Sequence, residues 1–214
     1  MRILVTGFEP FGGESVNPSL EAVRALAAWR PQGVTLGVAP LPVSAVGLGA
    51  ALRAAVAAHA AEAVLLVGQA GSRIEVSVER VGINVIDARI PDNDGAQPVD
   101  VPVMPGGPAA YLATLPIKAI AAALRAGGVP AAVSNTAGTF LCNAGLYLAC
   151  HLAATQFPGL RAGFLHVPLL PEQAARHPGA PSMALPTIVA GLRIAVETIR
   201  DTHQDIVAGE GRTD

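Results

Sequence analysis

The chain of 214 residues is 51% hydrophobic and only 14% charged, with a formal net charge of −2. That balance leaves no basic surface for a nucleic acid. No run of about 20 residues is free of charge and of Pro or Gly, as a membrane-spanning helix requires. Residues 1–7 are interrupted too soon for a signal peptide. We therefore expect a cytoplasmic location, with neither nucleic acid nor membrane as a partner.

Short apolar runs alternate with helical patterns in the first third of the chain. The expected elements are strands at 3–6, 34–39 and 63–67 and helices at 17–29 and 44–60. Asn17 and Pro18 are typical of an N-cap and a first helical position, and Ser44 is expected to cap the second helix. The alternation predicts a doubly wound sheet, and the continuously apolar run at 63–67 indicates a strand buried on both faces.

Residues 74–86 follow a different pattern, in which apolar and polar residues alternate. A period of two indicates half-exposed antiparallel strands, which we expect to form a hairpin added to the parallel core. In the polar loop that follows, Asp92, Asn93 and Asp94 superficially resemble a calcium-binding loop. The spacing and the terminal Glu of such loops are lacking, so we expect no metal there.

The second half of the chain continues the alternation of helices and strands. The expected elements are an irregular segment at 102–116, a helix at 117–126, a strand at 129–133, a helix at 145–157, a strand at 161–167, an irregular segment at 169–184, a helix at 186–207 and a frayed tail at 209–214. No repeat or interdomain linker is visible, so we expect one α/β domain spanning residues 1–214. Its predicted architecture is a three-layer α/β/α sandwich with a mostly parallel twisted sheet and an added antiparallel hairpin.

Cys142 lies in a loop of small residues between the predicted strand at 129–133 and the predicted helix at 145–157. The free N–H groups and the dipole of a helix N-terminus favour a thiolate, so a reactive cysteine suits this position. By itself, a cysteine in an apolar stretch is more often a buried hydrophobic residue. Cys150 would lie about 12 Å further along the same helix, too far for a disulfide. A free thiol fits a reducing compartment.

His166 is the best candidate to act with Cys142. It ends the predicted strand that follows the cysteine helix, so a β–α–β crossover would bring it beside the loop that opens that helix. The remaining histidines lie in amphipathic helices, too far along the cysteine helix, or in a polar loop: His59, His151, His177 and His203. A third group would orient the imidazole. Pattern alone leaves four acids equivalent: Glu75, Glu79, Asp87 and Asp92.

Glycine-rich loops follow two predicted strands, at 7–13 and 68–72. Neither matches the dinucleotide-binding fingerprint, and the sequence has no Walker lysine and no G-x-S-x-G motif, so phosphate binding and a serine nucleophile are disfavoured. Phe8 and Phe11 flank the first loop. They form either a hydrophobic plug beneath it or the aromatic wall of a small pocket.

The order and spacing of several segments resemble the pyroglutamyl peptidases of type I, cysteine exopeptidases that remove an N-terminal pyroglutamyl residue. The segments are TGFEPFGG at 6–13 with Asn17 and Pro18, GQAG at 68–71, ERV at 79–81 with Asn84, DARIPDN at 87–93, Tyr111 with TLPIK at 114–118, NTAGTF at 135–140 with Cys142 and Asn143, and HVP at 166–168. They cover nearly the whole chain. Gly82 and Ser72 depart from the family's usual alanine and glycine, but neither change removes a reacting group.

The resemblance implies that Cys142 is the nucleophile, that His166 acts as base and then as acid, and that Glu79 orients His166. It also implies a pocket for the pyrrolidone ring formed by Phe8, Phe11, Asn17, Gln69, Arg89, Phe140 and Leu141. The implied substrates are N-terminally pyroglutamylated peptides, cleaved through a thioester without cofactor or metal, and the implied assembly is a homotetramer. Pyroglutamate is a neutral lactam, which apolar walls and one or two amide partners suit.

Two other interpretations come from different classes of protein. A nucleoside-phosphorylase-like transferase would also use a mixed α/β sheet with glycine loops, although the chain has no basic cluster for phosphate. A non-catalytic peptide-binding protein would keep the pocket without turnover. Hydrolysis of a chromogenic pyroglutamyl amide would distinguish a peptidase from both.

Overall fold

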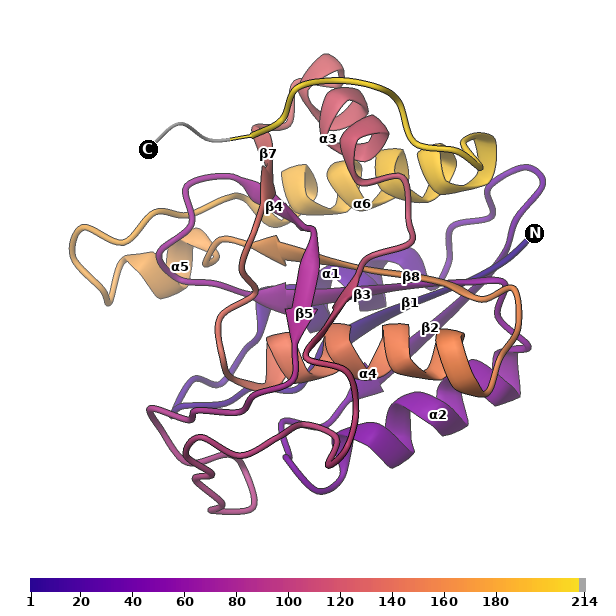
Figure 1. Ribbon diagram of the computed structural model, residues 1–214. Coiled ribbons are helices and arrows are strands. Elements are labelled where there is room, and N and C mark those ends of the chain that lie inside the picture. The colour runs from indigo at the N-terminus through magenta and orange to yellow at the C-terminus, as the bar shows by residue number, and fades with distance from the viewer. Residues whose placement is uncertain (212–214) are drawn as a thin grey trace.

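The computed structural model describes residues 1–211 and is built around a six-stranded sheet with the order β2-β1-β3-β8-β4-β7 (Figure 1). Its strands are β1 (Arg2–Phe8), β2 (Thr35–Leu41), β3 (Ala63–Gln69), β4 (Val76–Glu79), β7 (Ala131–Ser134) and β8 (Arg161–Val167). A separate antiparallel pair consists of β5 (Val81–Ile83) and β6 (Ala110–Leu112). The helices are α1 (Pro18–Leu26), α2 (Leu48–His59), α3 (Ile117–Ala126), α4 (Leu141–Thr155), α5 (Pro171–Ala174) and α6 (Leu185–Asp201).

Helices cover both faces of the sheet, with α1, α3 and α6 on one face and α2 and α4 on the other (Figure 1). Successive side chains of a strand alternate between the two layers, so that in β3 Leu65 packs into the first and Leu66 into the second. Both are buried, which is why this strand is apolar throughout. The predicted three-layer sandwich with a mostly parallel sheet is confirmed.

The carboxyl ends of β2, β1, β3 and β8 meet at one edge of the sheet because these four strands run parallel. In this register Gly68 of β3 lies opposite His166 of β8. β4 runs antiparallel to β8 and parallel to β7, so the last two strands run the other way. The loops after β1 and β3 therefore reach the same edge as His166, where open α/β sheets place their sites.

The expectation of a half-exposed hairpin at 74–86 is wrong in its pairing. β4 does not pair with β5. It lies inside the main sheet between β8 and β7 and is buried along its whole length. Its polar residues Ser77 and Glu79 are buried as well, because they face the polar site described below. β5 leaves the sheet and pairs with β6 across the outside of α4, which supplies the antiparallel pair.

Several element boundaries also differ from the sequence patterns. The second helix begins at Leu48 because the Ser44 hydroxyl accepts a hydrogen bond from Gly47 N–H and closes a turn before the helix. The last helix ends at Asp201, and the segment expected to be irregular contains α5. Glu210 forms an ion pair with Arg125 of α3, so 209–211 are tied to the body, whereas 212–214 lie outside the described residues. Asn17 and Pro18 occupy the expected positions at the start of α1.

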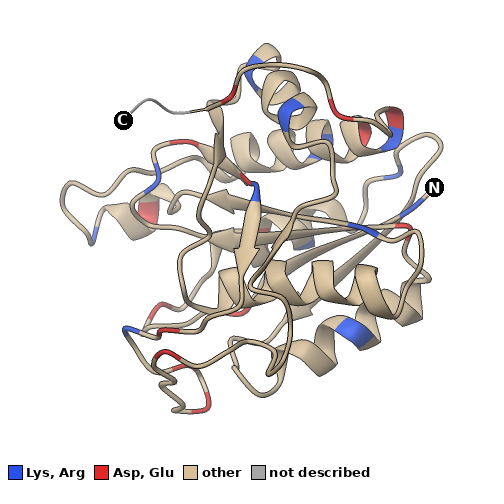
Figure 2. Ribbon diagram, viewed as in Figure 1, with Lys and Arg blue, Asp and Glu red and all other residues tan. Residues whose placement is uncertain are grey.

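Charged side chains are sparse on the sheet-covering helices, and α4 carries none (Figure 2). This helix is covered on its outer side by α2 and by the β5–β6 pair, so it needs no charged face. Within residues 1–211 no helix is both long and apolar enough to cross a membrane.

Candidate active site

Three side chains predicted from the sequence meet at the carboxyl edge of the parallel strands. His166 Nδ1 lies 2.8 Å from Glu79 Oε1, and Glu79 and His166 are 0% and 4% exposed. Cys142 lines the same cavity as His166, and against the effect of burial its charge and hydrogen bonding raise the pKa of the imidazole. Since Nδ1 is engaged by Glu79, the nitrogen left for the thiol is Nε2. The arrangement is a thiol, an imidazole and a carboxylate in line.

The antiparallel register of β4 and β8 explains why Glu79 is the acid that reaches His166. Ser77 lies directly opposite His166, and Glu79 lies opposite Phe164. Glu79 and His166 are therefore diagonal neighbours on one face of the pair, within reach of long side chains. The Phe164 ring packs against the imidazole, with 4.8 Å between ring centroids, and limits its rotation. Register, which the sequence pattern leaves open, selects this acid among the four candidates.

Cys142 is the second residue of α4, because the helix begins at Leu141 and not at the predicted residue 145. The thiol therefore lies in the first turn of the helix, the position that suits a reactive cysteine. The helix begins without a side-chain cap at Phe140, so the N–H groups of its first turn remain available. A β carbon on Gly68 would lie 2.8 Å from Cys142 Sγ, which is closer than real contacts allow. Glycine at this position lets the thiol lie directly over the end of β3.

The topology that brings Cys142 to His166 is not the expected β–α–β unit. β4 lies between β7 and β8, and β7 runs antiparallel to β8. The juxtaposition comes instead from α4 and β8 alone, since α4 lies against β8 and the chain reverses direction between them. The predicted pair is therefore present, although the strand before the helix is not a parallel neighbour.

Two opposing influences act on the pKa of His166. Burial is the largest effect and lowers the pKa of His166, but Cys142 and Glu79 together outweigh it and raise this pKa to about 9. The Glu79 carboxylate and the Cys142 sulfur next to the ring favour its protonated form, the imidazolium. The site can therefore hold a protonated histidine at neutral pH.

Arg73 lies behind the carboxylate and was not recognised from the sequence. Its Nη2 lies 3.8 Å from Glu79 Oε1 and donates to the Thr136 carbonyl oxygen at 3.0 Å. Glu79 Oε2 is buried and has no hydrogen-bond partner within residues 1–211, so this nearby cation offsets part of the cost of burying the charge. The isolated arginine in a glycine loop carried no local signal, because its partner belongs to a later strand.

A cavity of about 620 Å³ opens beside the thiol. The lining residues are Phe11, Gln69, Asp87, Arg89, Ile90, Ala137, Gly138, Thr139, Phe140, Cys142 and His166. Phe11 and Phe140 face each other with 6.4 Å between ring centroids, which supports the aromatic-wall interpretation for Phe11. Gln69 and Arg89 also line this cavity, as the sequence resemblance implies.

Phe8, Asn17 and Leu141 are not among the lining residues. Phe8 is buried in the core against Phe164, and Leu141 is buried beneath the start of α4. Asn17 is 1% exposed: its Oδ1 accepts from Ser19 N–H and its Nδ2 donates to the Glu9 carbonyl oxygen. Its amide therefore holds the loop that carries Phe11 and does not face the cavity.

The remaining titratable candidates have other surroundings. Cys150 is buried, and burial raises the pKa of its thiol to about 12, so it stays protonated. The Asp92 carboxylate accepts backbone N–H bonds from Ala45, Asp94 and Ala96 and holds its loop. Within residues 1–211 no group of three or more His, Cys, Asp or Glu side chains is arranged to hold a metal ion.

The fold and this site define a cysteine-dependent hydrolase of the α/β class, with the thiol at a helix N-terminus and a buried imidazole–carboxylate pair. Residues 1–202 match the family model of pyroglutamyl peptidases. The chain belongs to the pyroglutamyl peptidase family, a family of cysteine exopeptidases.

Individual relatives agree with this assignment. The chain is 54% identical to a pyrrolidone-carboxylate peptidase of Streptomyces coelicolor, over 99% of both chains. It is 50% identical to the Escherichia fergusonii pyrrolidone-carboxylate peptidase, over 99% of this chain and 98% of the other. The crystal structure of pyroglutamyl peptidase I from Bacillus amyloliquefaciens superimposes with a TM-score of 0.95 at 43% identity, covering 97% of this chain and 99% of that one. The predicted family and enzyme class are confirmed, and the transferase and non-catalytic alternatives are not favoured.

Proposed function

We propose that this chain removes an N-terminal pyroglutamyl residue from peptides, with Cys142 as nucleophile, His166 as base and acid, and Glu79 as the group that orients His166. The observation that carries this assignment is the 2.8 Å contact between Glu79 Oε1 and His166 Nδ1, which turns Nε2 toward Cys142. The carboxylate fixes the tautomer of the ring and stabilises the imidazolium.

In the acylation step the Cys142 thiolate attacks the carbonyl carbon of the pyroglutamyl residue. The sulfur–carbon bond forms, and the carbonyl electrons move to the oxygen, which the backbone N–H of Cys142 at the uncapped helix start is placed to stabilise. As the intermediate collapses, the bond to the leaving amine breaks and His166 Nε2–H gives that nitrogen its proton. A thioester and the shortened peptide result.

Hydrolysis of the thioester reverses these roles. His166, now neutral, takes a proton from a water molecule that attacks the thioester carbonyl carbon. The carbon–sulfur bond then breaks, pyroglutamate leaves, and the thiolate and imidazolium are restored. Every proton in the cycle passes through His166, so no metal or cofactor is needed.

The cavity suits a neutral lactam ring. Phe11 and Phe140 supply apolar walls, and Gln69 supplies one amide partner. We assign Arg89, which is exposed at this cavity, to the peptide beyond the ring. Phe8, Asn17 and Leu141 are assigned a supporting role beneath the walls, since each is buried.

The test is hydrolysis of a chromogenic pyroglutamyl amide. We expect turnover that thiol alkylation abolishes and that a chelator does not change. Cys142→Ser should lose this turnover while it keeps the thermal stability of the natural chain. Undiminished turnover in Cys142→Ser would refute the mechanism, and phosphate-dependent cleavage of a nucleoside would revive the transferase.

We also propose three properties of the whole protein: a single domain spanning residues 1–214, a cytoplasmic location and a homotetramer. The resemblance to the family suggests the tetramer, and several apolar side chains on the surface are compatible with self-association. They include Val46, Ile74 and Leu112, which are 87%, 75% and 65% exposed. Sedimentation velocity should give the mass of four chains, and a mass of one chain would contradict the assembly.

A further inference from the structure

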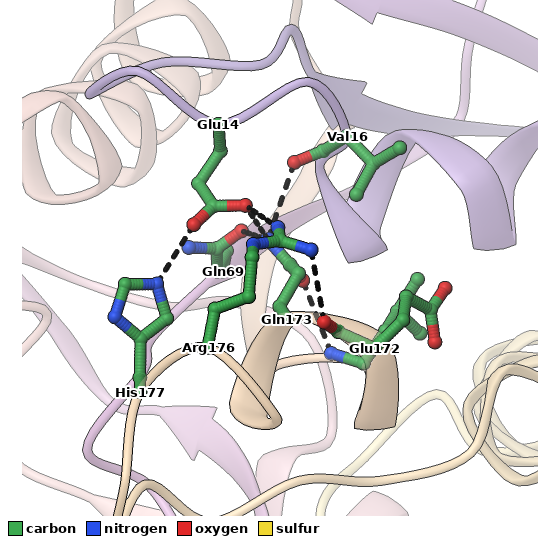
Figure 3. Close-up of polar contacts among 8 residues, drawn as sticks. Glu14, Val16, Gln69, Glu172, Gln173, Arg176 and His177 are labelled. Atoms are coloured by element: carbon green, nitrogen blue, oxygen red, sulfur yellow. Dashed lines mark hydrogen bonds and ion pairs between the residues drawn. The ribbon is translucent and has the colours of Figure 1, made fainter.

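The carboxamide of Gln173 is completely buried between α5, the end of β3 and the loop after β1 (Figure 3). It lies within hydrogen-bond distance of four groups, which we call the Gln173 cluster: its Oε1 accepts from one of them, and the two hydrogens of its Nε2 are shared among the other three. The partners are Leu170 N–H, Gln69 Oε1, Glu14 Oε2 and the Val16 carbonyl oxygen. Burial of a polar side chain is costly unless it is hydrogen-bonded, so the partners of Gln173 show what it is held for.

The chemistry of the partners fixes which way the Gln173 amide points. Leu170 N–H can only donate, and it lies 3.1 Å from Gln173 Oε1. Gln173 Nε2 faces Glu14 Oε2 and the Val16 carbonyl oxygen, each at 3.3 Å, and both of these can only accept. A flipped amide would place oxygen against oxygen and N–H against N–H. The orientation therefore follows from the backbone and a carboxylate.

Ion pairs keep Glu14 in its role as an acceptor. Its carboxylate accepts from His177 Nε2 at 2.8 Å and from Arg176 Nη2 at 2.6 Å. The hydrogen bond from His177 is the largest of the effects that lower the pKa of Glu14, so the group stays ionised. Figure 3 shows Arg176 and His177 approaching this carboxylate from the segment that follows α5. Within residues 1–211 neither side chain forms a hydrogen bond with Gln69.

The fixed amide of Gln173 determines the orientation of Gln69. Gln173 Nε2 donates to Gln69 Oε1 at 3.2 Å, so the oxygen of Gln69 is turned away from the cavity that it lines. Gln69 Nε2 forms no hydrogen bond within residues 1–211, and Figure 3 shows it at the end of the amide away from Gln173. It is therefore the end of the amide left for the cavity that Gln69 lines. This cavity also contains Cys142 and His166.

We propose that Gln173 is a positioning residue that holds Gln69 as a hydrogen-bond donor toward the ring carbonyl oxygen of the substrate lactam. This inference rests on the proposed function, because it describes how the same cavity recognises its substrate. A freely rotating Gln69 would accept from a ring N–H or donate to a ring carbonyl equally well. With Oε1 engaged, only an acceptor on the ring is matched, and a ring with no carbonyl leaves a buried donor unpaired.

The test uses 2-pyrrolidone and cyclopentanone as competitive inhibitors of pyroglutamyl amide hydrolysis. Both carry the ring carbonyl, and only 2-pyrrolidone carries the N–H. Gln173→Met, which cannot donate, should weaken both inhibitors by about 10-fold, the effect of one hydrogen bond. Gln69→Met should weaken both to a similar extent, and the double variant should lose no more than Gln69→Met alone, since Gln173 acts through Gln69.

The rate at which iodoacetamide alkylates Cys142 serves as a readout that does not use the lactam contact. It should stay unchanged in Gln173→Met if the role is positioning, and should fall with the inhibitor affinities if the variant merely loosens the site. Arg53→Gln on α2, which removes an exposed hydrogen bond to Gln156 and no contact of the Gln173 cluster, is the control and should bind both inhibitors as the natural chain does. If Gln173→Met fails to fold, Gln173→Leu also removes the donor without adding a charge and should show the same loss.

Unchanged affinity for 2-pyrrolidone in a folded Gln173 variant would overturn the inference. So would weaker binding of 2-pyrrolidone with unchanged binding of cyclopentanone, because Gln69 would then contact the ring N–H. Failure of the proposed function looks different: the natural chain itself would neither hydrolyse the pyroglutamyl amide nor bind 2-pyrrolidone.

Discussion

Gly68→Ala tests whether the thiol needs the space directly above the end of β3. A β carbon at position 68 would lie 2.8 Å from Cys142 Sγ and 2.6 Å from Phe164 Cζ. Ordinary van der Waals contact begins near 3.4 Å, so these atoms would have to retreat by about 0.6 and 0.8 Å. Phe164 is buried and packs against His166, so any movement of its ring disturbs the imidazole as well.

The expected loss of rate exceeds the expected loss of stability. Overpacking a core by one carbon costs about 1–3 kcal/mol, which lowers Tm by about 2–4 °C per kcal/mol in a chain of this size. A misplacement of about 1 Å at a reacting atom costs on the order of 10²-fold in rate. Since the required shifts at Cys142 and Phe164 approach that distance, we expect kcat/KM to fall by about 10²-fold in a protein that still folds.

The assay compares kcat/KM for a pyroglutamyl amide with the thermal midpoint in Gly68→Ala and in Gly71→Ala. A β carbon at Gly71, in the loop that follows β3, would meet Leu169 at an ordinary 3.5 Å, so this control should keep most of the rate. If Gly68→Ala retained kcat/KM within about threefold of the natural chain, the close approach of Cys142 to β3 would not matter for catalysis and the argument would be refuted.

Three other measurements test the triad. Glu79→Gln should lower kcat by about 10²- to 10³-fold, less than Cys142→Ser does, because an orienting group does not itself react; equal losses would show that Glu79 does more than orient. Cys150→Ser should keep full turnover and full inactivation by iodoacetamide, since burial raises the pKa of Cys150 to about 12 and leaves it a thiol; resistance to iodoacetamide in this variant would contradict the assignment of Cys142. Burial lowers the pKa of His166, but Cys142 and Glu79 raise it to about 9 in the free enzyme, so the imidazolium persists through neutral pH and kcat/KM should fall as the pH rises past about 9. Alkylation of Cys142 should not fall over the same range, and a kcat/KM that declines near pH 6.5 would show that the pair does not protect the imidazolium.

The sequence predicted an element correctly where local features, such as a helix-stopping glycine or a continuously apolar run, determine its ends. The bounds of α3 and β8 agree with the sequence, because Gly127 and Gly128 stop the helix and the strand is buried on both faces. β4 was misassigned because its alternation of apolar and polar residues is normally a sign of exposure. Here the polar face of the strand is buried against the site, and a local pattern cannot distinguish water from a buried histidine and arginine.

The Cys142–His166 pair was predicted from a β–α–β crossover, but the structure brings the two residues together in another way. α4 has 15 residues and spans about 22 Å at 1.5 Å per residue, and β8 has 7 residues and spans about 23 Å. A helix and a following strand of equal length, joined by a reversal, place the helix start over the strand end whatever precedes the helix. Glu79 and Gln173 could not be selected in this way, because register and a contact 104 residues apart decide them.

The start of α4 has no side-chain cap, and a helix without one is less stable at that end. Asn143 supplies the missing support from the side. It is 1% exposed, and its amide accepts from Ile83 N–H and donates to the Ile83 and Val85 carbonyl oxygens. β5 can approach this closely because Gly82 has no β carbon, which would lie 2.7 Å from the Tyr147 nitrogen. Because Asn143 anchors the helix from the side, the first N–H groups of α4 can remain without a side-chain cap. In the proposed mechanism these N–H groups stabilise the thiolate and the oxyanion.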